Sequence, residues 1–141
     1  MKFWDTSALA ALCCHEPGSH AARSHWVGSG HCAWKWSWIE LYSAFCRKRN
    51  EGGLTDQEVV IAAQKREDLF AALNVFVDVD LVFAEAESVL RHHILKAADA
   101  TQLAAANLLA GKSRDRTFLC FDRKLCAAAA REGFSVPLAP K

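Results

Sequence analysis

The chain has 141 residues, of which 52% are hydrophobic, and its formal net charge is +1. This length suits a single domain over residues 1–141, and the apolar content excludes an intrinsically disordered chain. No apolar run approaches the ~20 residues that span a membrane, and the N-terminus lacks a signal-peptide apolar region, so we expect a cytoplasmic protein without membrane contact. The small net charge means that any nucleic-acid binding must be local.

The first half of the chain alternates short apolar runs with helical stretches. We predict strands at 2–4 and 32–36 and helices at 8–14, 19–27, 37–50 and 55–73. Ser37 and Thr55 each precede a glutamate, Glu40 or Glu58, by three residues, which is the spacing of a capping box. Both pairs therefore predict the start of a helix.

The second half continues the same alternation. We predict strands at 75–79, 117–121 and 134–138 and helices at 83–92, 99–110 and 122–132. Strands that alternate with helices form parallel sheets covered on both faces. In such sheets, ligands bind beyond the carboxyl ends of the strands, near the point where the strand order reverses.

Six cysteines occur in the sequence, and none form a Cys-x-x-Cys pair. This spacing argues against a zinc knuckle. Most of the cysteines lie in apolar segments. We therefore expect reduced, buried thiols that pack as small apolar side chains.

Four acids lie in positions that call for an explanation. Asp5 follows the first strand and Asp122 follows the strand at 117–121, so both are directed to the ligand-binding edge of the sheet. Glu40 and Asp99 lie among apolar neighbours in helical segments. A carboxylate buried without a partner costs several kcal/mol, so a helix N-terminus or a cation must compensate for it.

Each of the four acids has a purely structural alternative. Asp5 and Asp122 could be helix N-caps, Glu40 could belong to a capping box, and Asp99 could be an acid favoured by a helix dipole. Taken together, they fit one acidic pocket better than four unrelated caps. Such a pocket needs hard cations such as Mg²⁺ or Mn²⁺, which can activate water for phosphodiester cleavage.

Four segments in chain order resemble the motif blocks of PIN-domain proteins, with the closest likeness to VapC-type toxins of type II toxin–antitoxin pairs. The segments are Asp5-Thr6-Ser7-Ala8-Leu9, Ser37-Trp38-Ile39-Glu40-Leu41-Tyr42-Ser43-Ala44, the run from Ala98 through Asp99 to Ala106, and Phe121-Asp122-Arg123-Lys124-Leu125. Glu16-Pro17-Gly18 and Arg47-Lys48-Arg49 followed by Gly52-Gly53-Leu54 add to the likeness, which covers nearly the whole chain.

The resemblance implies a Rossmann-like three-layer α/β/α sandwich with a mostly parallel, five-stranded sheet. It implies a Mg²⁺- or Mn²⁺-dependent endoribonuclease that leaves a 5′-phosphate and a 3′-hydroxyl. Asp5, Glu40, Asp99 and Asp122 would be its catalytic, metal-binding acids, with Thr6 orienting the site through its hydroxyl. It also implies a homodimer and a cognate antitoxin that blocks the site, with operator DNA bound only through the antitoxin.

Three other functions compete with this interpretation. A phosphatase of the haloacid dehalogenase kind needs a second Asp two residues after the first, and position 7 is a serine. A toxin-like subunit could act mainly as a binding module in an antitoxin complex on operator DNA. A PIN nuclease could also serve in RNA processing without an antitoxin.

Basic residues and tryptophans could also contact RNA. The basic residues that could bind phosphates are Arg47-Lys48-Arg49, Arg114, Arg116 and Arg123-Lys124. The alternative is solvated charge, and Arg47-Lys48-Arg49 is also well placed at the end of a helix. Trp34, Trp36 and Trp38 alternate in the sequence. This spacing favours one buried face of a strand, and stacking on bases is the alternative.

Overall fold

The computed structural model describes residues 1–141 and contains four strands and seven helices. The strands are β1 (Lys2–Trp4), β2 (His31–Trp34), β3 (Asn74–Phe76) and β4 (Thr117–Leu119). The helices are α1 (Thr6–Cys13), α2 (Ser19–His25), α3 (Ser37–Asn50), α4 (Asp56–Ala72), α5 (Val79–His92), α6 (Ala97–Ala110) and α7 (Arg123–Arg131).

The four strands form one parallel sheet in the order β3-β2-β1-β4. Phe3 of β1 lies opposite Cys32 of β2 and Phe118 of β4. The chain builds the sheet from β1 through β2 to β3 and then returns to place β4 on the other side of β1. The strand order therefore reverses between β1 and β4, where open α/β sheets bind their ligands.

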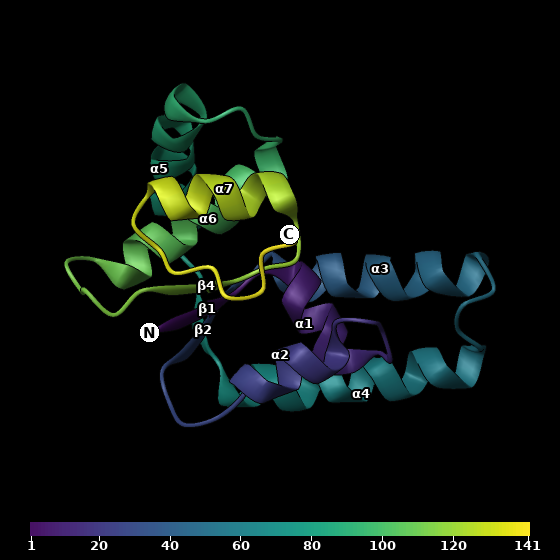
Figure 1. The fold of residues 1–141 in the computed structure, drawn as a ribbon. Helices are drawn as coiled ribbons and strands as arrows, with labels where there is room; N and C mark the ends of the chain where they lie inside the picture. The colour runs from purple at the N-terminus through teal and green to yellow at the C-terminus, as the bar shows by residue number, and fades with distance from the viewer.

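Helices cover both faces of the sheet, so the molecule has three layers (Figure 1). Successive strand residues point to opposite faces. Phe3 packs into a core cluster with residues of α5, α6 and α7, whereas Trp4 packs into a second cluster with residues of α1, α3 and α4. The Phe3 ring stacks on Phe118 at 5.3 Å between centroids. The α/β sandwich expected from the sequence is confirmed.

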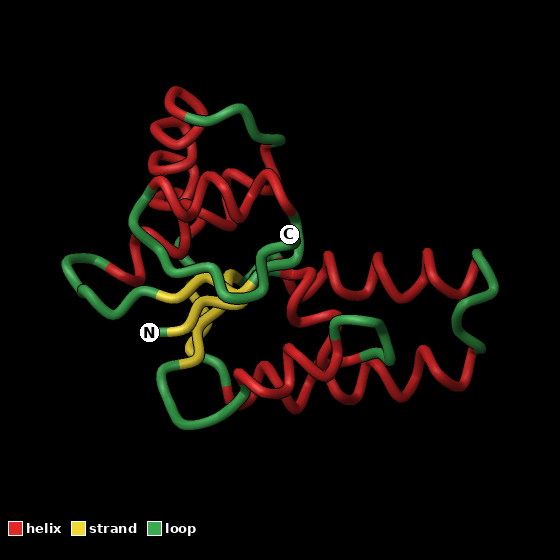
Figure 2. Tube along the Cα trace, in the orientation of Figure 1, coloured by secondary structure: helices red, strands yellow, loops and turns green.

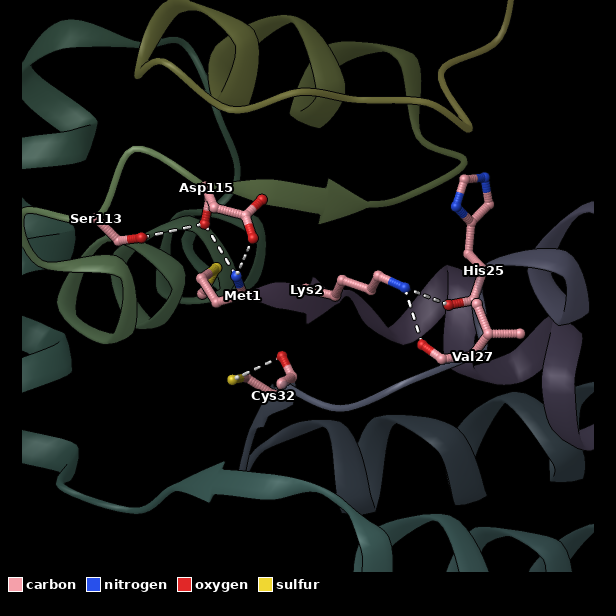
Figure 3. A network of polar contacts seen from close by, with 8 residues as sticks. Met1, Lys2, His25, Val27, Cys32, Ser113 and Asp115 are labelled. Carbon is pink, nitrogen blue, oxygen red and sulfur yellow. Dashed lines mark hydrogen bonds and ion pairs between the residues drawn. The ribbon is translucent and has the colours of Figure 1, made fainter.

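At the amino ends of the strands, polar contacts tie β1 to two neighbouring loops (Figure 3). The N-terminal ammonium group of Met1 donates to the carbonyl of Asp115 at 2.9 Å. Lys2 Nζ donates to the carbonyls of His25 and Val27 at 3.2 and 3.0 Å. These contacts fasten the edge of the sheet that lies opposite the acid-bearing strand ends.

The sheet has four strands, so the prediction of a fifth strand at 134–138 is wrong. The segment pairs with β4 through a single bridge, Thr117 to Ser135, and then leaves the sheet. Ser135 N donates to the carbonyl of Arg116, but the next residue due to donate is Pro137, which has no N–H. Phe134 and Leu138 are still buried. Figure 2 shows this segment as a loop that passes along the sheet.

Several predicted element ends also differ from the structure. β2 ends at Trp34 rather than at residue 36, so Trp36 and Trp38 belong to the start of α3 instead of to a strand face. β3 ends at Phe76, because Asp78 accepts a hydrogen bond from Leu81 N and starts α5 four residues earlier than expected.

Of the two predicted capping boxes, one is confirmed and one is wrong. Thr55 and Glu58 make the reciprocal bonds at the start of α4. Ser37 is instead the first residue of α3, its side chain caps nothing, and it turns inward to other partners. All six cysteines are free thiols, as expected, and five are buried. None of the helices is both long and apolar enough to cross a membrane.

Candidate functional site

A pocket of about 850 Å³ lies beyond the carboxyl ends of β1 and β4. All four acids singled out in the sequence line it, and they reach it from four different elements. Asp5 follows β1, and Asp122 follows β4 by three residues. Glu40 lies in the first turn of α3 and Asp99 in the first turn of α6. Residues 23 to 117 positions apart in the sequence therefore meet at one place.

Asp5 is the most deeply buried of the four acids, with 5% of its surface exposed. Its Oδ2 accepts hydrogen bonds from Ser7 N at 3.1 Å, from Ser7 Oγ at 2.7 Å and from Cys120 Sγ at 3.3 Å. The bond from Ser7 N makes Asp5 the N-cap of α1. Burial raises the pKa of the Asp5 carboxyl, although these hydrogen bonds act to lower it.

Glu40 is held by side chains from two other elements. Its Oε1 accepts from Thr6 Oγ1 at 3.0 Å and from Gln102 Nε2 at 2.8 Å. Burial raises the pKa of the Glu40 carboxyl, and the nearby charges of Asp5 and Asp99 add to the rise. Thr6 therefore lies where the sequence placed it, in contact with an acid of the pocket.

Gln102 is a residue of the site that the sequence reasoning missed. Its side chain is 1% exposed and lies behind the acids, where Nε2 approaches Thr6 Oγ1, Ser37 Oγ and Glu40 Oε1 within 3.0 Å. Thr6 and Ser37 also pair with each other at 2.8 Å. The one available signal was a glutamine within the alanine- and leucine-rich run of α6, because a buried amide must find hydrogen-bond partners.

Asp99 is half-buried, and no hydrogen bond reaches its carboxylate from another residue. Burial raises the pKa of the Asp99 carboxyl, and the charges of Asp5 and Asp122 raise it further, against a smaller opposing effect of Lys96. A location in the first turn of α6 suits an acid, as the dipole interpretation predicted. The same location also directs Asp99 into the pocket.

Asp122 is exposed, and it is both a helix N-cap and a residue of the acidic pocket, which are the two interpretations that the sequence offered. Its Oδ1 accepts from Leu125 N at 2.9 Å, which makes it the N-cap of α7. It also lines the pocket. Cys120, two residues before it, donates toward Asp5, so the segment that follows β4 supports both carboxylates.

The donor set suits a hard divalent cation that keeps part of its water shell. No group of three or more His, Cys, Asp or Glu side chains forms a ready-made metal site. Mg²⁺, however, commonly binds through one or two carboxylates and several waters. The pKa values of Asp5, Glu40 and Asp99 are all raised, and neighbouring carboxylates contribute for Glu40 and Asp99. A bound cation would relieve that repulsion.

One rim of the pocket is basic. Arg47 and Lys48 line it from the carboxyl half of α3, and Glu16 lines it from the loop after α1. Lys48 Nζ pairs with Glu16 Oε1 at 2.6 Å. The Arg47 side chain is exposed and forms no ion pair, so one positive charge stands free beside the acidic pocket.

Comparisons with known proteins support the fold. No protein-family model matches the sequence, and no curated protein matches it significantly. A structure described as a toxin–antitoxin complex from Klebsiella pneumoniae matches 99% of this chain and all of its own chain, with a TM-score of 0.67 and 16% identity. A crystal structure of a protein from Pyrobaculum aerophilum matches 96% of this chain and 83% of its own, with a TM-score of 0.60 and 19% identity. At these identities the likeness concerns the fold.

Proposed function

We propose that the chain is a divalent-metal-dependent endoribonuclease of the PIN-domain kind and the toxin of a toxin–antitoxin pair. The observation that carries the proposal is the convergence of Asp5, Glu40, Asp99 and Asp122 on one pocket at the reversal of strand order. Caps alone would not need to converge. Each of the four motif blocks identified in the sequence contains one of these acids, and the fold brings the four blocks together around the pocket.

In this proposal, the four carboxylates hold one or two Mg²⁺ or Mn²⁺ ions. Such an ion supplies charge neutralisation and activation of water for attack on a phosphodiester. Ser7 and Cys120 fix the Asp5 carboxylate, while Thr6 and Gln102 fix that of Glu40. Partners behind the ligands of a metal commonly orient them and tune their affinity.

The test is cleavage of single-stranded RNA by the purified chain with Mg²⁺ or Mn²⁺. We expect cleavage that stops with EDTA, returns with excess metal, and leaves 5′-phosphate and 3′-hydroxyl ends. Cleavage that persists in EDTA, or none with either metal in a folded chain free of other proteins, would contradict the proposal. An Asp5→Asn chain purified in the same way, whose cleavage should be strongly reduced, controls for contaminating nucleases.

An antitoxin partner is the second part of the proposal, and the neighbouring fold in the toxin–antitoxin complex from Klebsiella pneumoniae favours it. The partner would cover the acidic pocket, and the chain would form a homodimer that meets operator DNA only through that partner. Growth arrest on expression of this chain, relieved by co-expression of a small protein encoded beside it, is the expected result. A chain that binds DNA with its partner but never cleaves RNA would instead be a binding module.

A further inference from the structure

Helix α3 presents a row of different chemistries along one face of the pocket. Trp36, Glu40, Ser43 and Arg47 are spaced at three or four residues and all line the pocket. This spacing places side chains on the same side of a helix. With a rise of 1.5 Å per residue, Trp36 and Arg47 are about 16 Å apart along the axis, with the acid Glu40 between them.

Trp36 is unlike the other four tryptophans. Its side chain is 54% exposed, whereas Trp4 and Trp34 are buried. Trp26 stacks on His31, and Trp38 packs against Phe70 and under the guanidinium of Arg66. Trp36 has no aromatic or cationic partner and makes no capping bond at the start of α3. Its ring therefore remains open at the rim of the acidic pocket.

Arg47 is the free cation of the basic triplet at the end of α3. Its neighbour Lys48 pairs with Glu16, and Arg49 lies 3.7 Å from Asp56 and does not line the pocket. Arg47 lies about 10 Å beyond Glu40 on the same helix face. Because the net charge of the chain is only +1, such a local cation must offset the repulsion between a polyanion and the acids.

We propose that α3 is the track of a single-stranded RNA, with a base stacked on Trp36 and a backbone phosphate bound by Arg47, on opposite sides of Glu40. This inference rests on the proposed function and deepens it. Aromatic side chains hold unpaired bases, and bases in a duplex are not free to stack on them. The track therefore selects single strands and sets the line, parallel to α3, along which the RNA crosses the pocket.

Tryptophan fluorescence tests the position of the base. The probe is a short single-stranded RNA oligonucleotide, added to protein carrying Asp5→Asn, the substitution expected to slow cleavage most. We expect the RNA to quench the tryptophan fluorescence, and we expect this quenching to be lost in the double variant that also carries Trp36→Phe. A duplex of the same sequence should cause no quenching. Equal quenching with and without Trp36 would overturn the inference and leave Trp36 as a contact for a protein partner.

Substitution of the same residue in the active chain gives the second readout. Trp36→Ala should raise KM about tenfold with little change in kcat, since a stacked base contributes binding. Trp36→Tyr should restore most of the affinity. Phe83→Ala is the matched control, because Phe83 is equally exposed, at 55%, but lies on α5 outside the pocket. Equal effects of Trp36→Ala and Phe83→Ala would contradict the track.

The salt dependence of RNA binding tests Arg47. The slope of log K against log salt is negative, and each lost phosphate contact on a single strand makes it less steep by about 0.7. Arg47→Ala should show this change, Arg47→Lys should retain the slope, and Arg49→Ala on the same helix should match the parent chain. An unchanged slope in Arg47→Ala would overturn this part of the track.

These measurements separate the two proposals. Binding at Trp36 and Arg47 without cleavage in Mg²⁺ or Mn²⁺ would overturn the nuclease and support the track. Cleavage without effects of Trp36 and Arg47 would support the nuclease and overturn the track.

Discussion

The acidic pocket has two unlike halves. Asp5 and Glu40 are held by hydrogen bonds from Ser7, Cys120, Thr6 and Gln102, which come from three segments of the chain. On the other side, the Asp99 carboxylate accepts no hydrogen bond, and the exposed Asp122 carboxylate accepts one only from Leu125 N, at the start of its own helix. Hydrogen bonds fix the half with Asp5 and Glu40 in the absence of any ligand. The half with Asp99 and Asp122 is positioned only by the first turns of α6 and α7.

This difference shows how one site can combine a fixed frame with carboxylates that are free to adjust. Buried polar groups that satisfy each other hold a fixed geometry. The carboxylates of Asp99 and Asp122 can move toward a cation and lose few hydrogen bonds when they do so. We therefore expect substitutions in the fixed half to affect catalysis most, and substitutions in the loose half to reveal charge repulsion and helix capping.

The largest expected effect is that of Asp5→Asn. The amide keeps an oxygen that can accept from Ser7 and cap α1, so the fold should persist. Loss of the central negative charge should lower kcat/KM for RNA by roughly 10²–10³-fold, comparable with the loss of a key electrostatic group in other enzymes. Kinetics on protein with an unchanged circular dichroism spectrum measure this. Activity within a few fold of wild type would show that Asp5 is only a cap.

Gln102→Leu tests whether the hidden network matters. The change removes the amide that contacts Thr6, Ser37 and Glu40. We expect a 10- to 100-fold loss of kcat/KM, the range typical of partners that orient metal ligands. Asn107→Leu, on the same helix but outside the pocket, is the control for polar-to-apolar change. Equal losses in both variants would assign the effect to the stability of α6.

A pair of substitutions separates the two properties of Asp122. Asparagine is as good an N-cap as aspartate, so Asp122→Asn should change the free energy of unfolding by only a few tenths of a kcal/mol. Asp122→Ala should lose about 1 kcal/mol in a denaturant titration. If the charge supports a cation, both variants should lose about tenfold in activity. Full activity in Asp122→Asn would leave Asp122 with a capping role alone.

The smallest expected effect concerns stability. The pKa of Asp99 is raised in the folded protein, so ionisation of this carboxyl opposes folding. The penalty is absent below the unfolded pKa of 3.8 and complete above the raised folded value. Asp99→Asn should therefore stabilise the metal-free chain at neutral pH, by an amount that the partial exposure of Asp99 keeps small, and should not stabilise it at about pH 3. Mg²⁺ should narrow the difference, which thermal unfolding at the two pH values would measure.

The sequence predicted the layers, all four strands and the meeting of the acids, because apolar strands followed directly by acids define one edge of a parallel sheet. The sequence-based prediction failed where the spacing of residues does not determine the direction in which a side chain points. Ser37 and Glu40 have the same spacing as Thr55 and Glu58, yet the Ser37 hydroxyl turns inward to Gln102. The predicted fifth strand is absent because Pro137 has no N–H to continue the pairing with β4 beyond Ser135.

Residues that depend on distant partners could not be found from local patterns. Gln102 contacts Thr6, 96 positions earlier, and nothing next to it in the sequence indicates that contact. Trp36 was grouped with Trp34 on a strand, but the strand ends at Trp34 and α3 begins immediately afterwards. The ring of Trp36 is therefore directed to the pocket rim instead of the core.

The most direct measurement of the central claim is calorimetric binding of Mn²⁺ to the purified chain and to Asp5→Asn, Glu40→Gln, Asp99→Asn and Asp122→Asn. All four acids should contribute to one site, so wild type should bind and every variant should bind more weakly, most of all Asp5→Asn. Arg49→Ala, outside the pocket, should bind as wild type does. The claim that the four acids form one metal site would be contradicted if the folded wild type bound no Mn²⁺. It would also be contradicted if the wild type and the four variants bound Mn²⁺ equally well.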